Sequence, residues 1–149
     1  DKALWIADRH PELNLDRLFL EEAALLHDIG VFMTDADGIH CFGSHPYICH
    51  GILGAELLRN EGFGEEIARV AERHTGAGLT IDDIDRQQLP LPRKDYLPET
   101  MLEKLICYAD KFFSKTHLGE EKPIERIKAS LAKHDPQYIE QFDEWYIMF

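Results

Sequence analysis

Histidine and aspartate side chains that could bind a metal ion recur along the first 110 residues of this chain. In the stretch LLHDIG, residues 25–30, His27 stands directly before Asp28, and the other four residues are leucine, isoleucine or glycine. Such a stretch is expected to be buried, where an unpaired carboxylate is costly. A bound metal ion or a simple hydrogen bond would offset that cost. The pair therefore raises the question of what holds it in place.

Three further residues could complete a metal site. His50 opens the stretch HGILG, His74 follows an amphipathic segment, and Asp110 lies in LICYADKFF among mostly apolar neighbours. Aspartate is a poor helix former and is rarely buried without a partner. Imidazole and carboxylate ligands together suit Fe, Mn, Ni, Co or Zn, as one or two ions. Such ions activate and orient water, so the residue types predict a divalent transition-metal site suited to attack on phosphorus.

Each of these residues also has a structural explanation. His27 and His74 could be helix-terminal histidines favoured by the helix dipole. His50 could pack beside glycines that allow close helix approach, Asp28 could cap a turn, and Asp110 could pair with a lysine or a distant arginine. These explanations compete with metal binding for each residue taken alone. The five residues taken together favour the metal.

Three more residues are candidates for contact with a phosphorylated substrate. Lys111 follows Asp110 and could reach a phosphate, although a solvated side chain is the simpler interpretation. Arg93 lies in a proline-containing connector that could fold over the site; a guanidinium matches phosphate oxygens well, but surface charge is the default explanation. His45 precedes Pro46, which favours the first turn of a helix, and substrate contact is its alternative role.

The elements that must position these residues are predicted to be helices, because helical periodicity dominates and no segment shows sustained strand-like alternation. We expect helices at residues 1–10, 18–27, 46–59, 65–74, 99–116, 122–134 and 136–147. Residues 34–44 are predicted to form a loop, and residues 79–97, which contain two prolines, an irregular connector. The aromatic cluster of Trp145, Tyr146 and Phe149 suits the core or a homodimer contact. The predicted fold is all-α, a single irregular helical bundle.

The whole chain has the size and composition of one globular domain. It has 149 residues, 44% of them hydrophobic and 30% charged, and no apolar run of the roughly 20 residues that span a membrane. The three cysteines, Cys41, Cys49 and Cys107, form no close pair, which favours reduced thiols in the cytoplasm. The net charge of -12 opposes binding of a nucleic acid polymer, whereas local cations could still bind a small phosphorylated substrate.

The order of these motifs resembles the HD-domain phosphohydrolase superfamily. The resemblance consists of His27-Asp28, then HG at His50, RHTG at His74 and YAD at Asp110, and it spans about residues 1–118. LLHDIG is similar to the signature of the HDIG branch. The resemblance implies that His27, Asp28 and Asp110 bind a metal, and that His50 and His74 bind a second metal or the substrate phosphate. Family members cleave phosphomonoester, phosphodiester or phosphoanhydride bonds, mostly in nucleotides.

The chain departs from the family pattern in two places. HD domains carry a further histidine on the first helix, well before the HD pair. That position would fall before Asp1, and His10 lies too near His27 to replace it. We therefore expect the natural domain to begin before Asp1. Cyclic dinucleotide phosphodiesterases of the family carry a GYP motif after a pair of histidines, whereas this chain reads RHTGAG around His74, which disfavours that branch.

The sequence thus predicts one HD domain over residues 1–149 with metal-dependent phosphohydrolase activity on a nucleotide or a related phosphate ester. Asp28, His50 and His74 are the candidate catalytic residues. A catalytically silent HD domain that binds a nucleotide for regulation is the alternative function. A purely structural helical protein is the third alternative, and it predicts no bound metal.

Overall fold

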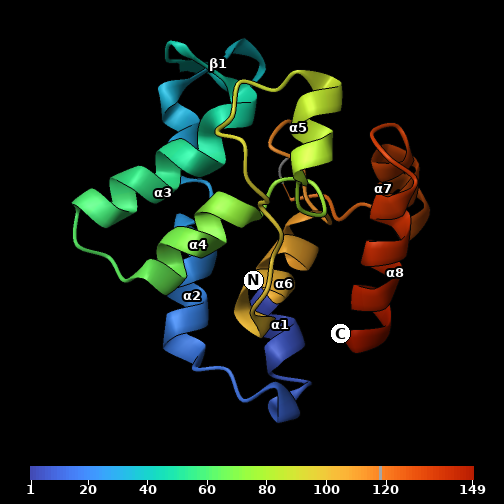
Figure 1. Cartoon of the computed structure of the whole chain (residues 1–149). Helices are drawn as coiled ribbons and strands as arrows, with labels where there is room; N and C mark the ends of the chain where they lie inside the picture. The colour runs from blue at the N-terminus through green and yellow to red at the C-terminus, as the bar shows by residue number, and fades with distance from the viewer. Residues whose placement is uncertain (118) are drawn as a thin grey trace.

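The computed structural model describes residues 1–117 and 119–149, and its helices pack around α6 (Figure 1). Seven of the ten residues of α6 are buried, and this helix contacts α1, α2, α4 and α8. The helices are α1 (Lys2–Ala7), α2 (Arg17–Leu26), α3 (His50–Asn60), α4 (Glu65–Arg73), α5 (Ile81–Gln87), α6 (Met101–Asp110), α7 (Ile124–Ala132) and α8 (Gln137–Met148). The predicted all-α bundle is confirmed. No helix in the described part of the chain is both long and apolar enough to cross a membrane.

The end of α2 is held against α3 by a very close backbone contact. After α2, Asp28 leads into a short 3-10 helix, Ile29–Met33. A Cβ atom placed on Gly30 would lie 2.1 Å from the carbonyl oxygen of His50 and 2.4 Å from the backbone nitrogen of Gly54. Because real Cβ atoms do not approach that closely, only glycine fits at residue 30. The glycine of LLHDIG therefore lets the His-Asp pair lie directly on α3.

A second close contact brings α3 onto α4. A Cβ atom on Gly51 would lie 2.8 Å from the carbonyl oxygen of Ala71. The apolar face of α4 is buried through Ile67, Ala68, Val70 and Ala71, which draws the helix into the core. His50 at the start of α3 and His74 at the end of α4 are thereby placed side by side.

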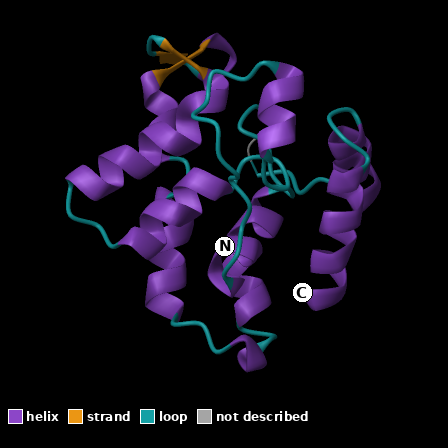
Figure 2. Cartoon of the chain, viewed as in Figure 1, coloured by secondary structure: helices purple, strands orange, loops and turns teal. Residues whose placement is uncertain are grey.

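Residues 34–46 form a small sheet where the sequence predicted a loop followed by the start of a helix (Figure 2). The strands are β1 (Thr34–Ala36), β2 (Cys41–Phe42) and β3 (His45–Pro46), in the order β2-β1-β3. Strand β1 pairs antiparallel with β2 and parallel with β3. These strands of two or three residues are too short to show alternation in the sequence. The helix expected from Pro46 accordingly starts at His50, after a 3-10 turn over Tyr47–Cys49.

The expectation of an irregular connector over residues 79–97 is wrong for α5. Thr80 and Asp83 form a complete capping box at the start of this helix, and the side chain of Ile84 within the helix is buried. The prolines all follow the helix. Reciprocal backbone hydrogen bonds between Leu79 and Tyr96, of 3.2 and 2.7 Å, then close the segment at its base.

The helix predicted over residues 99–116 ends at Asp110. Beyond it the backbone nitrogens of Lys111 and Phe112 bond to carbonyls three residues back, and Phe112 turns into the core beside Phe142. Phe113 instead faces outward and is 39% exposed. The sequence predicted that Asp110 lies in the middle of a helix, whereas it is the last residue of α6.

Candidate metal centre

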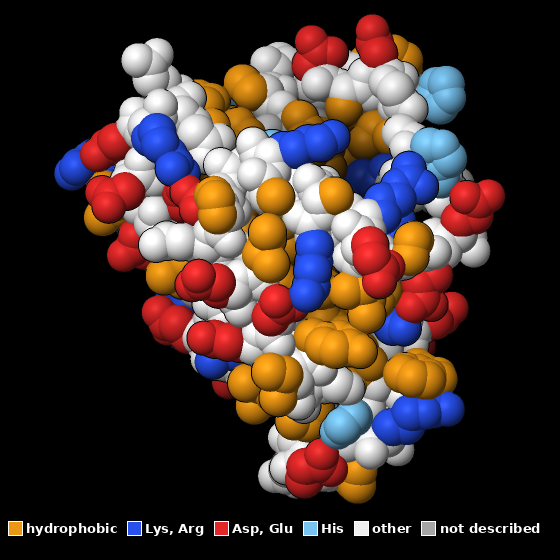
Figure 3. Space-filling view, turned by 90° about the vertical axis from the view of Figure 1, so that its right-hand side faces the viewer, with side chains coloured by type: hydrophobic (Ala, Val, Ile, Leu, Met, Phe, Trp, Pro, Cys, Tyr) orange, Lys and Arg blue, Asp and Glu red, His pale blue; other side chains and the backbone are white. Residues whose placement is uncertain are grey.

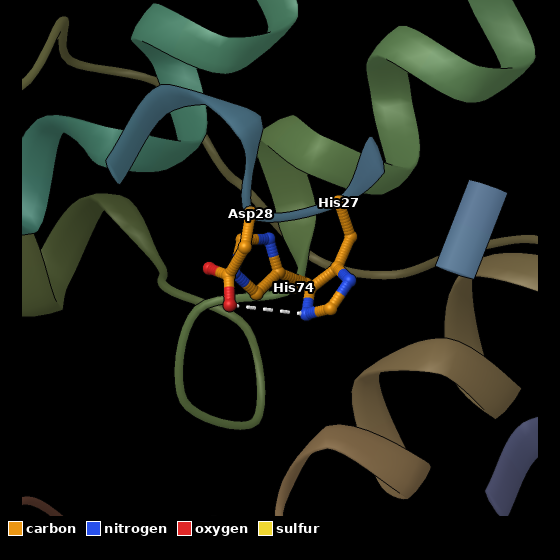
Figure 4. Close-up of side chains that lie close together, drawn as sticks. All are labelled: His27, Asp28 and His74. Carbon is orange, nitrogen blue, oxygen red and sulfur yellow. Dashed lines mark ion pairs between the residues drawn. The ribbon is translucent and has the colours of Figure 1, made fainter. Parts of the chain in front are cut away.

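All five predicted ligands lie close together, with the carboxylate of Asp28 at the centre. Figure 4 shows three of them, His27, Asp28 and His74, which form a group that could hold a metal ion. Its oxygens lie 3.3 Å from the Nε2 of His27, 3.2 Å from that of His74 and 3.7 Å from that of His50. Asp110 joins the group through its Oδ1, which is 3.4 Å from the Nε2 of His27. Ligand atoms that share one ion at about 2.1 Å lie roughly 3.0–3.4 Å apart. The cluster therefore has the dimensions of a metal site.

The three histidines are oriented by one repeated local device. Each ring donates its Nδ1 hydrogen to the carbonyl oxygen of the residue three positions earlier, because a carbonyl can only accept. The acceptors for His27, His50 and His74 are Ala24, Tyr47 and Ala71, at 2.7, 2.7 and 2.8 Å. In the neutral ring the other nitrogen, Nε2, then carries a lone pair. The Nε2 atoms of all three rings face Asp28, and metal-binding histidines are oriented in the same way by a hydrogen bond from their other ring nitrogen.

The polar atoms at the centre lack the partners that a metal would supply. The Nε2 atoms of His50 and His74 lie 3.0 Å apart, and two lone pairs cannot form a hydrogen bond. The Nε2 of His27 and the Oδ1 of Asp28 are buried without a hydrogen-bond partner among the described residues. A divalent cation would be bound by these same atoms, so the residues present fit a His/Asp metal centre.

The carboxylates of Asp28 and Asp110 remain ionised although they are half-buried. Burial raises the pKa of Asp28, but the neighbouring His27 and His74 outweigh this effect and hold the pKa well below the usual range. Burial also raises the pKa of Asp110, and the charge of Lys111 together with His27 lowers it far more. The two carboxylates thus supply two negative charges, which suits a divalent ion.

The pKa values of the three histidines shift in different directions, because only His27 lies beside both carboxylates. Burial lowers the pKa of His27, but the two carboxylates beside it, Asp110 and Asp28, raise it to about 10. Burial and the neighbouring His74 lower the pKa of His50 to about 4, and burial also lowers the pKa of His74. The proton of the metal-free centre is therefore held on His27, and it must leave before His27 can bind a metal.

Two lysines each form an ion pair with the Oδ2 atom of one carboxylate, Lys111 with Asp110 and Lys115 with Asp28. The Nζ of Lys111 lies 2.9 Å from Asp110 Oδ2 and donates to the carbonyl oxygen of His74. The side chain of Lys111 is 13% exposed, so the expectation that it is solvated is wrong. Lys115, which sequence reasoning missed, has its Nζ 2.7 Å from Asp28 Oδ2. It was missed because α6 was expected to run to residue 116, whereas the chain turns back toward the site after Asp110.

A cavity of about 280 Å³ opens beside the centre. His27, Asp28 and Asp110 line it, together with Lys115 and the start of α1. His50 and His74 lie deeper, at 4% and 2% exposure. Asp1 and Lys2 line this same cavity. The cavity therefore leads directly to three of the five candidate ligands.

The other two candidate substrate contacts are not brought to this cavity. Arg93 is exposed and forms a two-pronged ion pair with Asp85 of α5, at 2.9 and 2.7 Å. His45 is exposed in β3. Neither residue lines the cavity that contains His27 and Asp28. The connector that carries Arg93 is tied to α5 and does not cover the centre.

Comparison with known families agrees with this geometry. Residues 1–114 match the model of the HD domain family. The chain therefore belongs to the HD-domain superfamily of metal-dependent phosphohydrolases, and the resemblance noted in the sequence is confirmed.

Individual relatives include an uncharacterized protein of Methanocaldococcus jannaschii, which is 38% identical over 135 residues, covering 90% of this chain and 71% of that protein. Two proteins named tRNA (cytidine(56)-2'-O)-methyltransferase are also similar. The one from Picrophilus torridus is 42% identical over 89% of this chain, and the one from Thermoplasma volcanium is 35% identical over 68% of it. The chain spans only 34% and 26% of the length of these two proteins. No solved structure matches the chain.

Proposed function

We propose that this HD domain is a metal-dependent phosphohydrolase whose substrate is a small nucleotide phosphomonoester, phosphodiester or phosphoanhydride. The observation that carries the proposal is the convergence of three imidazole Nε2 atoms on the ionised carboxylate of Asp28. A structural role would not require an arrangement that leaves the nitrogens of His50 and His74 facing each other without a hydrogen.

Within this proposal the residues divide into two groups. His27, Asp28 and Asp110 hold the metal at the wall of the cavity. The metal would supply positive charge to the phosphoryl oxygens and to the attacking water. His50 and His74 either hold a second ion or stabilise the negative charge that grows on the phosphate, usually a large contribution to such a reaction. Asp28 contacts both groups and orients the water toward phosphorus.

The dimensions and charge of the site favour a small anionic substrate. The cavity of about 280 Å³ lies just below the usual range for sites that bind drug-sized molecules, which starts at about 300 Å³. Acidic residues outnumber basic ones by 28 to 16, which opposes a long polyanion. Even so, Lys and Arg side chains gather around a hollow on the face shown in Figure 3. Such local cations attract a compact phosphate without attracting a nucleic acid duplex.

Two relatives named as tRNA methyltransferases contain a region similar to this chain, so a short RNA belongs among the substrates to be screened. The free thiols of Cys41, Cys49 and Cys107 support a cytoplasmic location. A catalytically silent domain that binds a nucleotide remains the competing proposal, and measured turnover distinguishes the two.

The test is metal content by mass spectrometry, followed by a hydrolysis screen with nucleoside mono-, di- and triphosphates, cyclic nucleotides and a short single-stranded RNA. We expect one or two equivalents of a transition metal, and release of phosphate from at least one small nucleotide. Asp28→Ala should lose both metal and turnover, whereas Asp35→Asn, which changes an exposed carboxylate in β1, should retain them. Absence of metal after reconstitution with Mn²⁺ or Fe²⁺ would overturn the proposal.

A further inference from the structure

Lys115 lies where the cavity meets Asp28, and the proposed function gives it no role so far. Its Nζ is 2.7 Å from Asp28 Oδ2, on the opposite carboxylate oxygen from the one nearest His50 and His74. The side chain is 33% exposed. It also lines a neighbouring cavity of about 370 Å³, with Tyr47 and Phe113 on its walls. Lys115 thus stands between the metal ligands and the route by which a substrate enters.

Lys115 is held less firmly than its neighbour Lys111. Lys111 is almost buried and contacts both Asp110 and a backbone carbonyl. Among the described residues, the Nζ of Lys115 has a single carboxylate partner, Asp28, and it lies 5.9 Å from the ring centroid of Tyr47. An ammonium group on a flexible stem with one partner can move when that partner is taken by another cation.

A metal ion would compete directly for this partner. Asp28 is also the central carboxylate of the proposed metal centre, and like charges close together in a low-dielectric site repel strongly. A divalent ion bound by Asp28 therefore removes the attraction that holds Lys115 and adds a repulsion. The ammonium group would then need an anion, and the cavity that it lines is the proposed site of the substrate phosphate.

We propose that Lys115 is a phosphate-binding residue that rests on Asp28 in the metal-free protein and turns to the substrate phosphate once a metal occupies the centre. The inference rests on the proposed function and deepens it. It makes metal binding and phosphate binding cooperative, because the metal both attracts the phosphate and frees a second cation for it. It further implies that the substrate presents a phosphate group with oxygens on the Lys115 side of the cavity.

The experiment measures binding by calorimetry, with Mn²⁺ alone and then with inorganic phosphate, for the wild type, Lys115→Met and Lys115→Arg. Lys128→Met is the matched control, because the side chain of Lys128 is 35% exposed and pairs with a carboxylate, Asp143, in the same way. For Lys115→Met we expect tighter Mn²⁺ binding and about tenfold weaker phosphate binding to the Mn²⁺-loaded protein, the loss of one charge-assisted hydrogen bond. Phosphate binding to the metal-free protein should not change. Lys115→Arg should restore most of the phosphate affinity.

The outcomes separate the two proposals. A wild type that binds no Mn²⁺ overturns the proposed function and this inference with it. A wild type that binds Mn²⁺, together with a Lys115→Met variant that binds phosphate as tightly as Lys128→Met does, overturns the role of Lys115 alone. If Lys115→Met binds both Mn²⁺ and phosphate more weakly, Lys115 has a structural role, and the proposal that it binds phosphate is overturned. Lys115→Gln provides the same comparison should the methionine variant fold poorly.

Discussion

The Nε2 atoms of His50 and His74 face each other at 3.0 Å, while the Nδ1 atom of each ring is already bonded to a backbone carbonyl. Two neutral imidazoles in this orientation present lone pairs to each other. The pair lies deep in the protein, so water cannot easily relieve the contact. The arrangement is unfavourable in the empty centre and favourable around a cation, which makes it a direct test of what the centre binds.

Replacing His50 with glutamine should affect the metal-free and metal-loaded proteins in opposite directions. The glutamine amide can donate a hydrogen bond to His74 Nε2, so the free energy of unfolding without metal should stay the same or increase. The affinity for Mn²⁺ should fall, because an imidazole ligand has been lost. Urea unfolding without metal and calorimetric titration with Mn²⁺ measure the two effects. A variant that loses stability without metal and keeps its affinity would show that His50 serves only packing.

Metal binding should stabilise the whole fold. A ligand present at about 100 times its dissociation constant adds roughly 2.7 kcal/mol to the free energy of unfolding. For a domain of this size that gain corresponds to a rise in melting temperature of about 5–10 °C. The rise should vanish in Asp110→Asn, which keeps the shape of the side chain and removes its charge, and should persist in Asp35→Asn. Thermal denaturation with and without Mn²⁺ provides the measurement.

Gly30→Ala should be severely destabilising. The new methyl group would meet the carbonyl oxygen of His50 at 2.1 Å, so α2 and α3 would have to separate. Overpacking of this kind typically lowers the free energy of unfolding by about 1–3 kcal/mol and occasionally by more. Because the new methyl group would meet backbone atoms, which cannot rotate away, we expect a loss of about 3 kcal/mol or more for Gly30→Ala. Gly38→Ala is the control, because a methyl group there meets no atom within 4 Å. Equal urea midpoints for the two variants would contradict the expected packing.

The stability contributed by Asp83 should disappear in acid. Burial raises the pKa of this carboxyl, but hydrogen bonds from Thr80 and the charge of Arg86 outweigh burial and lower it. The folded pKa therefore lies below the unfolded value of about 3.9, so the contribution is present above that pH and is lost as the pH falls through the folded pKa. Asp83→Asn should cost about 1 kcal/mol at pH 6 through the weakened cap. The difference between wild type and variant should shrink by pH 3, as measured by urea unfolding across that range.

Much of the site could be predicted from the sequence, because the ligands belong to short motifs with strong chemical character. A buried His-Asp pair, a histidine before a glycine and an aspartate among apolar residues each pointed to the same centre, and all five residues converge there. The helices from α2 to α4 and the pair α7 and α8 were predictable because their apolar faces repeat with helical period.

The parts that were missed depend on contacts rather than on pattern. Strands β1 to β3 are held by pairing over two or three residues, and α5 depends on a capping box in a segment whose two prolines, which lie after the helix, suggested an irregular connector. The end of α6 at Asp110 follows from Phe112 turning into the core, and this turn is what brings Lys115 to Asp28. Arg93 was a reasonable phosphate ligand by type, but Asp85 binds it elsewhere.

The close approach of Gly30 to α3 also affects how this protein unfolds. The backbone that carries the His-Asp pair is pressed against the helix that carries His50, and that helix is pressed against the one that ends in His74. Neither this segment nor α3 nor α4 can move away from the core without displacing the candidate ligands on the other two. Backbone amides around Gly30 should therefore exchange with deuterium only when the molecule opens globally, and a chelator that strips the centre should loosen the three helices as a single cooperative unit.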